Sequence, residues 1–534
     1  MDLTKRVVIQ LLFLFFLCYS LQIKAQSIQF MDGITIDSKD GTKLSANVYL
    51  PKDTQHTWPL IIMPNSWNLD EYEYSFPAQA FAKKGYVVLS YSARGWGKSE
   101  GLVNLASSDD LEDIDAIIAW ATHELPIDTQ HIGMAGISYG GGLSLLAATH
   151  DPRIKAVAVM SAWTDLESAF NNNNSPSNLM GSLLVQSGKM VGRLDPEIET
   201  NFQHLVQHIH YDETKQWAQA RSPQHFIEGI NRNQTAVYIS QNLGDRLFKP
   251  NALLHFFADV TAPKRMDLNQ GVHGSAEAPG LFGFDNYVWS QADKWFERWL
   301  KGVDNGIDKA PILSIEAKKG QRIVADQWPI DVIVKKYNLQ KRANLFSPGE
   351  LTTHEVVTTS SNTLHFGLVT GVNSGIPIVS PILESHADLP IITWLPGINP
   401  LNAIYYQTEP VRQNKTILGI PHVTLWYKPS SQKSQLIAYL YDVNPYGMGQ
   451  LISHGPVSRY HDIPGNYVVS EFDLAMSVHQ IAKGHRLALA IGTYDVLYSP
   501  PTTQDYTMQI AYGQSMASSI TIPFANQSIA DIPH

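Results

Sequence analysis

Cysteine is nearly absent from the sequence, and its single copy, Cys18, lies close to the N-terminus. A disulfide framework is therefore excluded, and a chain cut after Ala25 has no thiol nucleophile either. Charged residues are also scarce, at 16% against 44% hydrophobic residues, a balance that disordered chains do not have. The 39 Lys and Arg are outnumbered by 49 Asp and Glu, and this acidic excess excludes nucleic acid as a partner.

Long apolar runs are missing too. No eighteen consecutive apolar residues occur after the first thirty positions, which excludes a polytopic membrane protein. At the N-terminus, Lys5 and Arg6 precede an apolar run over residues 7–21, and Ala25 offers a small residue for cleavage. This pattern predicts a signal peptide over residues 1–25, with a membrane anchor as the alternative. We expect an exported protein, periplasmic or extracellular, with no stable membrane span after signal removal.

The 534 residues are too many for one compact core, and the sequence changes character near residue 305. Over residues 26–305, short apolar strands alternate with helix-like segments, which predicts a parallel sheet with helices on both faces. Residues 165–225 interrupt this pattern with polar, helix-like sequence and no strand, so we expect a helical cap over the edge of the sheet. Over residues 306–534, short strands separated by Gly, Pro, Asn and Asp indicate a β-sandwich or jelly roll.

A short motif follows one of the apolar strands directly. Residues 136–140 are Gly-Ile-Ser-Tyr-Gly, and a helix of small residues comes next. A G-x-S-x-G sequence between a strand and a helix is typical of a nucleophile elbow, which raises the serine oxygen above the sheet. We predict that Ser138 is a nucleophile; an ordinary glycine-rich turn is the alternative.

A nucleophilic serine needs a base, and an imidazole base needs an acid to fix its tautomer. In such folds the acid and then the base follow the serine, each after a later strand. The expected strand at 236–240 leads to Asp245, and the expected strand at 264–268 leads to His273 in a loop bounded by glycines. The sequence therefore predicts Asp245 as the acid and His273 as the base.

Longer stretches resemble the Xaa-Pro dipeptidyl-peptidase and cocaine esterase family of α/β-hydrolases. They are the hairpin at 40–51, the Arg-Gly and Ser-Glu-Gly loop at 91–101, the segment after the elbow helix at 151–157, and two late segments at 440–445 and 484–487. The resemblance implies an α/β-hydrolase domain with a helical cap insertion, followed by a jelly-roll domain of the galactose-binding type.

The resemblance also implies site residues. Ser138, Asp245 and His273 would form the triad, and the backbone N–H of Tyr139 would be one oxyanion donor. Relatives take the second donor from a tyrosine that follows the third strand's proline. Here that position is Asn65, whose side-chain amide is the candidate.

Further aromatic residues belong to this expectation. The alternatives to the amide as the second oxyanion donor are Ser66, Trp67, Tyr72 and Tyr74. Trp67 and Trp163 are predicted to bind substrate, although a core position explains Trp163 equally well.

These observations predict an exported serine hydrolase that cleaves ester or amide bonds of a small-molecule ester or a peptide, without metal or organic cofactor. A dipeptidyl-peptidase has to bind a free amino group, for which Asp165 and Glu167 are the nearest carboxylates. The expected mature chain lacks the N-terminal domain of the larger Xaa-Pro peptidases, which favours ester hydrolysis over dipeptide release. A non-catalytic secreted binding protein is the remaining alternative. His204 and His208, four residues apart, do not predict a metal site, because no carboxylate completes a known motif.

Overall fold

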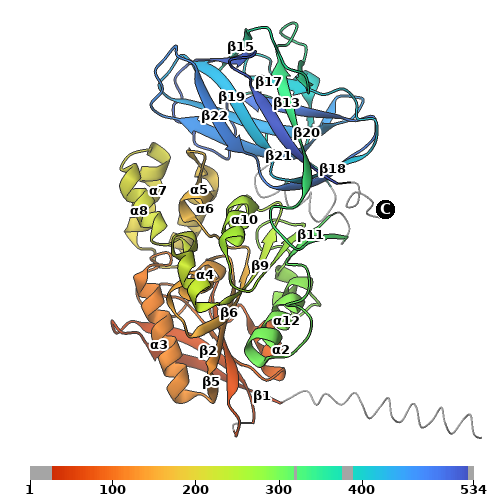
Figure 1. Ribbon diagram of the computed structural model, residues 1–534. Helices are drawn as coiled ribbons and strands as arrows, with labels where there is room; N and C mark the ends of the chain where they lie inside the picture. The colour runs from red at the N-terminus through yellow and green to blue at the C-terminus, as the bar shows by residue number, and fades with distance from the viewer. Residues whose placement is uncertain (1–26, 54, 318–320, 376–379, 381–388, 527–534) are drawn as a thin grey trace, which may run out of the picture.

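A computed structural model describes residues 27–53, 55–317, 321–375, 380 and 389–526. The predicted signal peptide lies outside these residues. The described chain forms two bodies stacked end to end, the N-terminal one below and the C-terminal one above in Figure 1. Within the described ranges, no helix is long and apolar enough to cross a bilayer.

The N-terminal body is built on a ten-stranded sheet with the order β1-β2-β4-β3-β5-β6-β9-β10-β11-β12. Neighbouring strands from β4 to β11 are parallel, whereas the pairs β1–β2, β2–β4 and β11–β12 are antiparallel. The strands are β1 (Ile28–Asp37), β2 (Lys43–Pro51), β3 (Trp58–Pro64), β4 (Val87–Tyr91), β5 (Ile127–Ile137), β6 (Ile154–Met160), β9 (Ala236–Asn242), β10 (Lys264–Asn269), β11 (Leu313–Glu316) and β12 (Arg322–Ala325).

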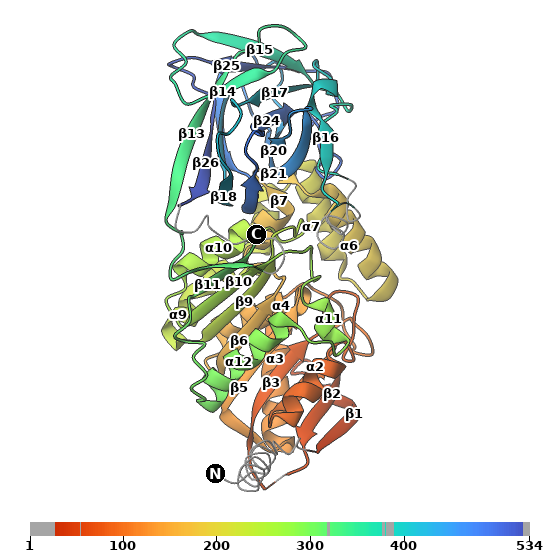
Figure 2. The same ribbon diagram turned by 90° about the vertical axis from the view of Figure 1, so that its right-hand side faces the viewer.

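Helices cover both faces of this sheet, as Figure 2 shows. On one face lie α3 (Ser108–Glu124), α4 (Tyr139–His150), α9 (Ile227–Asn233) and α10 (Pro250–Asp259); on the other lie α2 (Ser75–Lys83) and α12 (Tyr287–Lys301). Strand β3 shows why two cores form. Leu60 and Ile62 pack in the core with α3 and α4, whereas Ile61 and Met63 pack in the core with α2 and α12. Side chains alternate along a strand, so a continuous apolar run supplies both faces. The predicted fold class is confirmed.

Between β6 and β9 the chain forms the cap. It contains α5 (Leu166–Phe170), α6 (Asn178–Val191), α7 (Pro196–Gln207), α8 (Tyr211–Gln219) and the 3-10 turn η1 (Pro223–Phe226). The expectation that this segment has no strand is wrong in one detail, because β7 (Asn171–Asn172) and β8 (Ser175–Pro176) form a short hairpin. Its turn residues Asn173 and Asn174 have φ of 50° and 58°, a left-handed conformation that asparagine tolerates. The cap lies between the two bodies in Figure 1.

The C-terminal body is a sandwich of strands from a fourteen-stranded sheet, with an apolar core between its layers and a second buried apolar cluster on the other face of β20. The strands are β13 (Val332–Gln340), β14 (Gly349–Thr352), β15 (Ser360–His365), β16 (Ile392–Trp394), β17 (Ala403–Gln407), β18 (Lys415–Gly419), β19 (His422–Pro429), β20 (Ser434–Val443), β21 (Met448–Arg459), β22 (Val468–Asp473), β23 (Ser477–Ile481), β24 (Arg486–Gly492), β25 (Thr507–Tyr512) and β26 (Ser519–Ala525). The first sheet continues past residue 305, because Leu313 and Ile315 of β11 are fully buried beside β10.

Candidate active site

Ser138 is the single residue between the end of β5 and the start of α4. Its backbone has φ 54° and ψ −116°, which non-glycine residues rarely adopt. Its N–H donates to the carbonyl of Met160 at 2.8 Å, which fixes the turn against β6. The predicted strand–turn–helix arrangement is present, with the serine at its apex.

His273 joins Ser138 to Asp245. Its Nε2 lies 2.9 Å from Ser138 Oγ, and its Nδ1 lies 2.8 Å from Asp245 Oδ2. The carboxylate can only accept, so Nδ1 carries the hydrogen and Nε2 is left to accept from the serine hydroxyl. The structure therefore brings together the three side chains that the sequence analysis selected, in the order that nucleophilic catalysis requires.

Asp245 lies in the loop between β9 and α10 and is 2% exposed. Its Oδ1 accepts the backbone N–H groups of Leu247 and Phe248, both at 2.9 Å, and its Oδ2 also accepts from Gln241 Nε2 at 3.0 Å. These bonds compensate for the burial of the carboxylate and aim Oδ2 at the imidazole.

The charge state of His273 depends on two opposing effects. Burial lowers its pKa, but the charge of Asp245 and the hydrogen bond to it raise the pKa, and Glu277 adds in the same direction. The net effect is a His273 pKa above its usual value of 6.5. The imidazolium that forms when His273 takes a proton is therefore stabilised.

The candidate for the first oxyanion donor, the backbone N–H of Tyr139, lies next to Ser138. Tyr139 is the first residue of α4, so its backbone N–H has no acceptor within the helix and lies next to Ser138. The Asn65 amide does not complete the pair: Nδ2 donates to the carbonyls of Ser66 and Leu69, both at 2.7 Å, and Oδ1 accepts from Ala93 N. Asn65 is fully buried and its side-chain donors are in use.

The tyrosine alternatives are occupied as well. Tyr72 donates to Asp32. The Tyr74 hydroxyl is fully buried, accepts the N–H of Ile137 at 2.9 Å, and has Ser66 Oγ at 3.4 Å as a partner for its own hydrogen. The N–H of Ser66 donates to Glu73 at 2.6 Å. The backbone N–H groups of Trp67, Asn68 and Asp70 make no hydrogen bond to a described residue. Of these three residues, only Trp67 lines the pocket that contains Ser138.

A largely apolar pocket opens beside Ser138, between α4 and the cap. Its walls include the side chains of Trp67, Tyr139, Trp163, Leu184, Phe202 and Phe248. Trp67 meets Tyr139 edge-on at 5.7 Å, and Trp163 stacks on Tyr139 at 6.3 Å. Trp163 is 2% exposed and donates through Nε1 to the carbonyl of Arg221, so it is both a core residue and a wall of the pocket.

One carboxylate lines this pocket. Glu167 Oε1 accepts from Tyr211 Oη at 2.8 Å and from Asn171 Nδ2 at 2.9 Å, whereas Oε2 receives no hydrogen bond from a described residue. Asp165 is not part of the pocket lining. It caps α5 by accepting from Ser168 N at 3.1 Å and lines a separate cavity.

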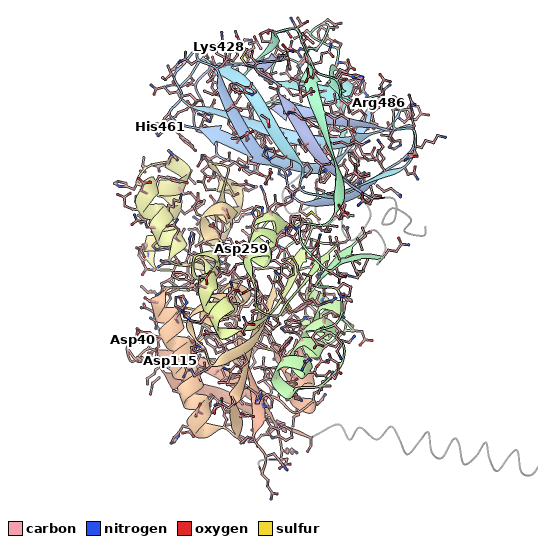
Figure 3. All side chains as sticks on the ribbon, viewed as in Figure 1. Asp40, Asp115, Asp259, Lys428, His461 and Arg486 are labelled. Carbon is pink, nitrogen blue, oxygen red and sulfur yellow. The ribbon has the colours of Figure 1, made fainter. Side chains whose placement is uncertain are left out.

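The cap histidines do not form a pair on one helix. Helix α7 ends at Gln207, and His208 follows in a left-handed conformation with its ring 3.6 Å from that of Tyr460. His461 lies 5.9 Å from the His208 ring, at the edge of the C-terminal body that faces the cap (Figure 3). Across the described ranges, no group of three or more His, Cys, Asp or Glu side chains could hold a metal ion.

Two residues of the site carry no sequence signal. Phe248 places its ring edge-on to His273 at 5.3 Å, and the fully buried Glu277 receives hydrogen bonds from the ends of β6 and β9. Phe248 follows Asp245 by three residues and Glu277 follows His273 by four. Only the fold shows that their side chains point toward the site.

Comparison with protein families assigns most of the chain. The model of the X-Pro dipeptidyl-peptidase (S15 family) matches residues 40–275, and that of the X-Pro dipeptidyl-peptidase C-terminal non-catalytic domain matches residues 305–525. A putative Xaa-Pro dipeptidyl-peptidase of Bacillus anthracis is 22% identical over 52% of this chain, and one of Streptomyces avermitilis is 22% identical over 81% of it. These matches cover 52% and 70% of the relatives, so the chain spans about half of the Bacillus protein.

Solved structures share the whole architecture. A CocE/NonD family hydrolase from Staphylococcus aureus superimposes with a TM-score of 0.72 at 14% identity, covering 94% of both chains. An α-amino acid ester hydrolase gives 0.71 at 17% identity, over 94% of this chain and 97% of the other. At these identities the likeness establishes the fold, an α/β-hydrolase followed by a strand-rich domain.

Proposed function

Because the chain belongs to the X-Pro dipeptidyl-peptidase (S15) family of serine hydrolases, we propose that it is an exported hydrolase that cleaves acyl esters through an acyl-enzyme on Ser138. The observation that supports this most directly is the chain of hydrogen bonds from Ser138 through His273 to Asp245. Recovery of the protein from the periplasm or medium with a new N-terminus after Ala25 would support export. Retention in the cytoplasm with residues 1–25 intact would contradict it.

The proposed reaction begins when Ser138 Oγ attacks the substrate carbonyl carbon while its proton passes to His273 Nε2. The carbonyl oxygen becomes an oxyanion, for which the backbone N–H groups of Tyr139 and Trp67 are the proposed donors. As the tetrahedral intermediate collapses, His273 returns the proton to the leaving alkoxide. Water then attacks the acyl-enzyme with His273 as base again, which releases the acid and restores Ser138.

The wall of the pocket favours an uncharged, apolar acyl group. Its aromatic and aliphatic side chains would bury such a group beside Ser138, at roughly 25 cal/mol per Å² of apolar surface. An anionic acyl group would lose hydration there, and among the described lining residues no Lys or Arg is available to pair with it.

The experiment uses a fluorophosphonate probe and a panel of p-nitrophenyl esters. We expect the wild-type protein to be labelled and Ser138→Ala to be unlabelled, with a loss of esterase rate on the order of 10⁴–10⁶. Ser144→Ala, which removes a buried hydroxyl of α4 outside the site, is the matched control. More than a tenth of the activity in folded Ser138→Ala would refute the assignment.

A second candidate, release of Xaa-Pro dipeptides, is favoured by Glu167. Its Oε2 faces no described hydrogen-bond donor and could bind the α-ammonium group of a peptide. If dipeptides are the substrates, kcat/KM for Ala-Pro anilides should exceed that for short esters. Glu167→Gln should then abolish this preference while Asp165→Asn retains it. If kcat/KM is instead higher for neutral acyl esters than for Ala-Pro anilides, and Glu167→Gln does not change it, ester hydrolysis remains the proposed function.

A further inference from the structure

Glu277 follows His273 by four residues and is fully buried without a cationic partner. Its Oε1 accepts from Ser240 Oγ at 2.9 Å and Ser161 Oγ at 3.2 Å, and its Oε2 accepts from Asn242 Nδ2 at 2.9 Å. Among the described residues, no Lys, Arg or His lies within ion-pair distance of this carboxylate. An isolated carboxylate costs free energy in such a place, so its presence needs a reason.

The hydrogen bonds around Glu277 all point toward it. Asn269 Nδ2 donates to Ser240 Oγ at 3.0 Å, which leaves the Ser240 hydrogen for Glu277. Ser161 Oγ accepts from Asn242 Nδ2 at 2.8 Å and from Gly274 N at 3.2 Å, and thus its own hydrogen is also left for Glu277. Burial raises the pKa of Glu277, whereas the hydrogen bonds from Asn242, Ser240 and Ser161 lower it. A carboxylate at the end of two such chains acts as an acceptor, which is the role of its ionised form.

The same bonds tie together the loops that carry the base and the acid. Gly274, next to His273, donates its N–H to Ser161, the residue that follows β6 and has a strained φ of 46°. Asn242 ends β9, and its carbonyl accepts the backbone N–H of Asp245 at 3.1 Å. A change at Glu277 would therefore disturb both sides of the His273–Asp245 hydrogen bond.

We propose that Glu277 is a positioning residue that aligns the His273 and Asp245 loops and adds a second negative charge to the field acting on the imidazolium. This inference rests on the proposed triad. Burial lowers the pKa of His273, whereas Asp245 and, more weakly, Glu277 raise it. Few other charged groups face the cluster. Arg322 reaches it only through Asn269 Oδ1, at 3.0 Å, and Glu316 lies 3.9 Å from Arg322.

The test is the pH profile of kcat/KM for a p-nitrophenyl ester. Glu277→Gln is nearly isosteric but uncharged, so it should lower the pKa of His273. The acid limb of the profile, where kcat/KM rises as His273 loses its proton, should move to lower pH by on the order of one unit. Because the alignment of the triad also changes, the plateau should fall by up to about 10²-fold. A residue with a merely structural role would lower the plateau without moving the limb.

Three variants make the comparison specific. Glu277→Asp keeps the charge, so its acid limb should return toward the wild-type position. Glu71→Gln changes another buried carboxylate, 1% exposed and bound by Ser45 Oγ at 2.8 Å, and should leave the limb in place. Ser240→Ala withdraws one donor that keeps Glu277 ionised, so it should move the limb in the same direction but by less.

The outcomes separate this inference from the proposed function. An unmoved limb in folded Glu277→Gln, or in Ser240→Ala if Glu277→Gln does not fold, would overturn the role of Glu277 while fluorophosphonate labelling of Ser138 persisted. Loss of Ser138-dependent labelling in the wild-type protein would instead refute the triad itself.

Discussion

Asp245 shows how one carboxylate selects the reactive form of the base. Oδ1 accepts two backbone N–H groups, and Oδ2 accepts from Gln241 and from His273, so the carboxylate has no freedom to rotate. Because only acceptors face Nδ1, the ring keeps its hydrogen there and presents Nε2 to Ser138. In the proposed reaction, the reactivity of Ser138 would therefore depend on a residue that it does not touch.

Replacing Asp245 with Asn tests this dependence. An amide can donate to Nδ1, which would move the ring hydrogen to Nε2 and leave the serine hydroxyl without an acceptor. We expect kcat to fall by about 10⁴ at neutral pH with the fold retained. Steady-state ester hydrolysis and thermal unfolding measure the two quantities. Asp259→Asn, at the exposed end of α10 labelled in Figure 3, is the control and should retain wild-type kcat. A loss below tenfold in Asp245→Asn would contradict the proposed role.

Sequence reasoning reached the triad because each member follows an apolar strand, and strand order alone brings the ends of parallel strands together. The sequence could not show whether Asn65 is the second oxyanion donor, because the direction of its amide depends on tertiary contacts. The amide oxygen accepts from Ala93 N, and the amide nitrogen donates to the carbonyl of Leu69. Glu277 was missed for the same reason. Its partners, among them Ser161 and Ser240, come from strands far apart in the sequence.

At the scale of elements, the turn from β5 into α4 needs glycine at positions 136 and 140. A Cβ on Gly136 would lie 2.4 Å from the backbone of Gly140, and a Cβ on Gly140 would lie 2.0 Å from the carbonyl oxygen of Pro64. These neighbours are backbone atoms, which cannot move aside to accommodate a Cβ as the end of a flexible side chain can. Helix α4 is buried along almost its whole length, so the strain cannot be relieved by moving the helix.

Gly140→Ala should therefore destabilise the protein by about 1–3 kcal/mol, through overpacking against β3. Esterase activity should also fall, because the displaced turn carries Ser138 and the N–H of Tyr139. Ser144→Ala, one turn further along α4, loses one hydrogen bond to the Gly140 carbonyl and should cost about 1 kcal/mol. Denaturant unfolding followed by tryptophan fluorescence compares the two. Equal stability of Gly140→Ala and the wild type would show that the turn tolerates a Cβ.

Strands β3, β4, β5, β6, β9 and β10 were predictable because each contains a short apolar run between turn signals. The hairpin of β7 and β8 contains no such run. Strands β11 and β12 were not predictable either, since they are short and lie where the composition already resembles the C-terminal body. Their place in the first sheet depends on the pairing of Leu313 with Met266, a contact that the local sequence does not reveal.

At the scale of the whole molecule, polar contacts join the two bodies next to the site. The Asn251 side chain of α10 donates to the carbonyl of Leu474 and accepts from the N–H of Met476, both at 2.8 Å. In the cap, Ser175 and Ser458 share a hydrogen bond of 2.8 Å. These contacts position the C-terminal body as a neighbour of the cap and of the Asp245 loop. We therefore expect one calorimetric unfolding transition, whereas two independent transitions would contradict tight docking.

Lys249 lies at the centre of this junction. Its Nζ donates to Tyr498 Oη at 3.1 Å, and that hydroxyl also pairs with His454 Nε2 at 3.0 Å. Burial, with a smaller contribution from Arg246, lowers the pKa of Lys249 to about 7, while Asp495 acts in the opposite direction. Asp165, His255 and Asp473 line the cavity next to Lys249. With this pKa, we expect Lys249 to make its contact with Tyr498 as a neutral amine at alkaline pH.

The last prediction follows from the sign of this shift. Between pH 7 and 10.5 the unfolded chain keeps a proton on Lys249 that the folded protein releases, so this group makes stability rise with pH across that window. Lys249→Met removes the titration, so the difference in melting temperature between variant and wild type should favour the variant at pH 7 and shrink toward pH 10. Lys264→Met is a suitable control, because its Nζ binds backbone carbonyls within the N-terminal body and its pKa is lowered less. A Lys249→Met difference that stays constant over this range, measured by differential scanning calorimetry, would show that Lys249 stays charged at the junction.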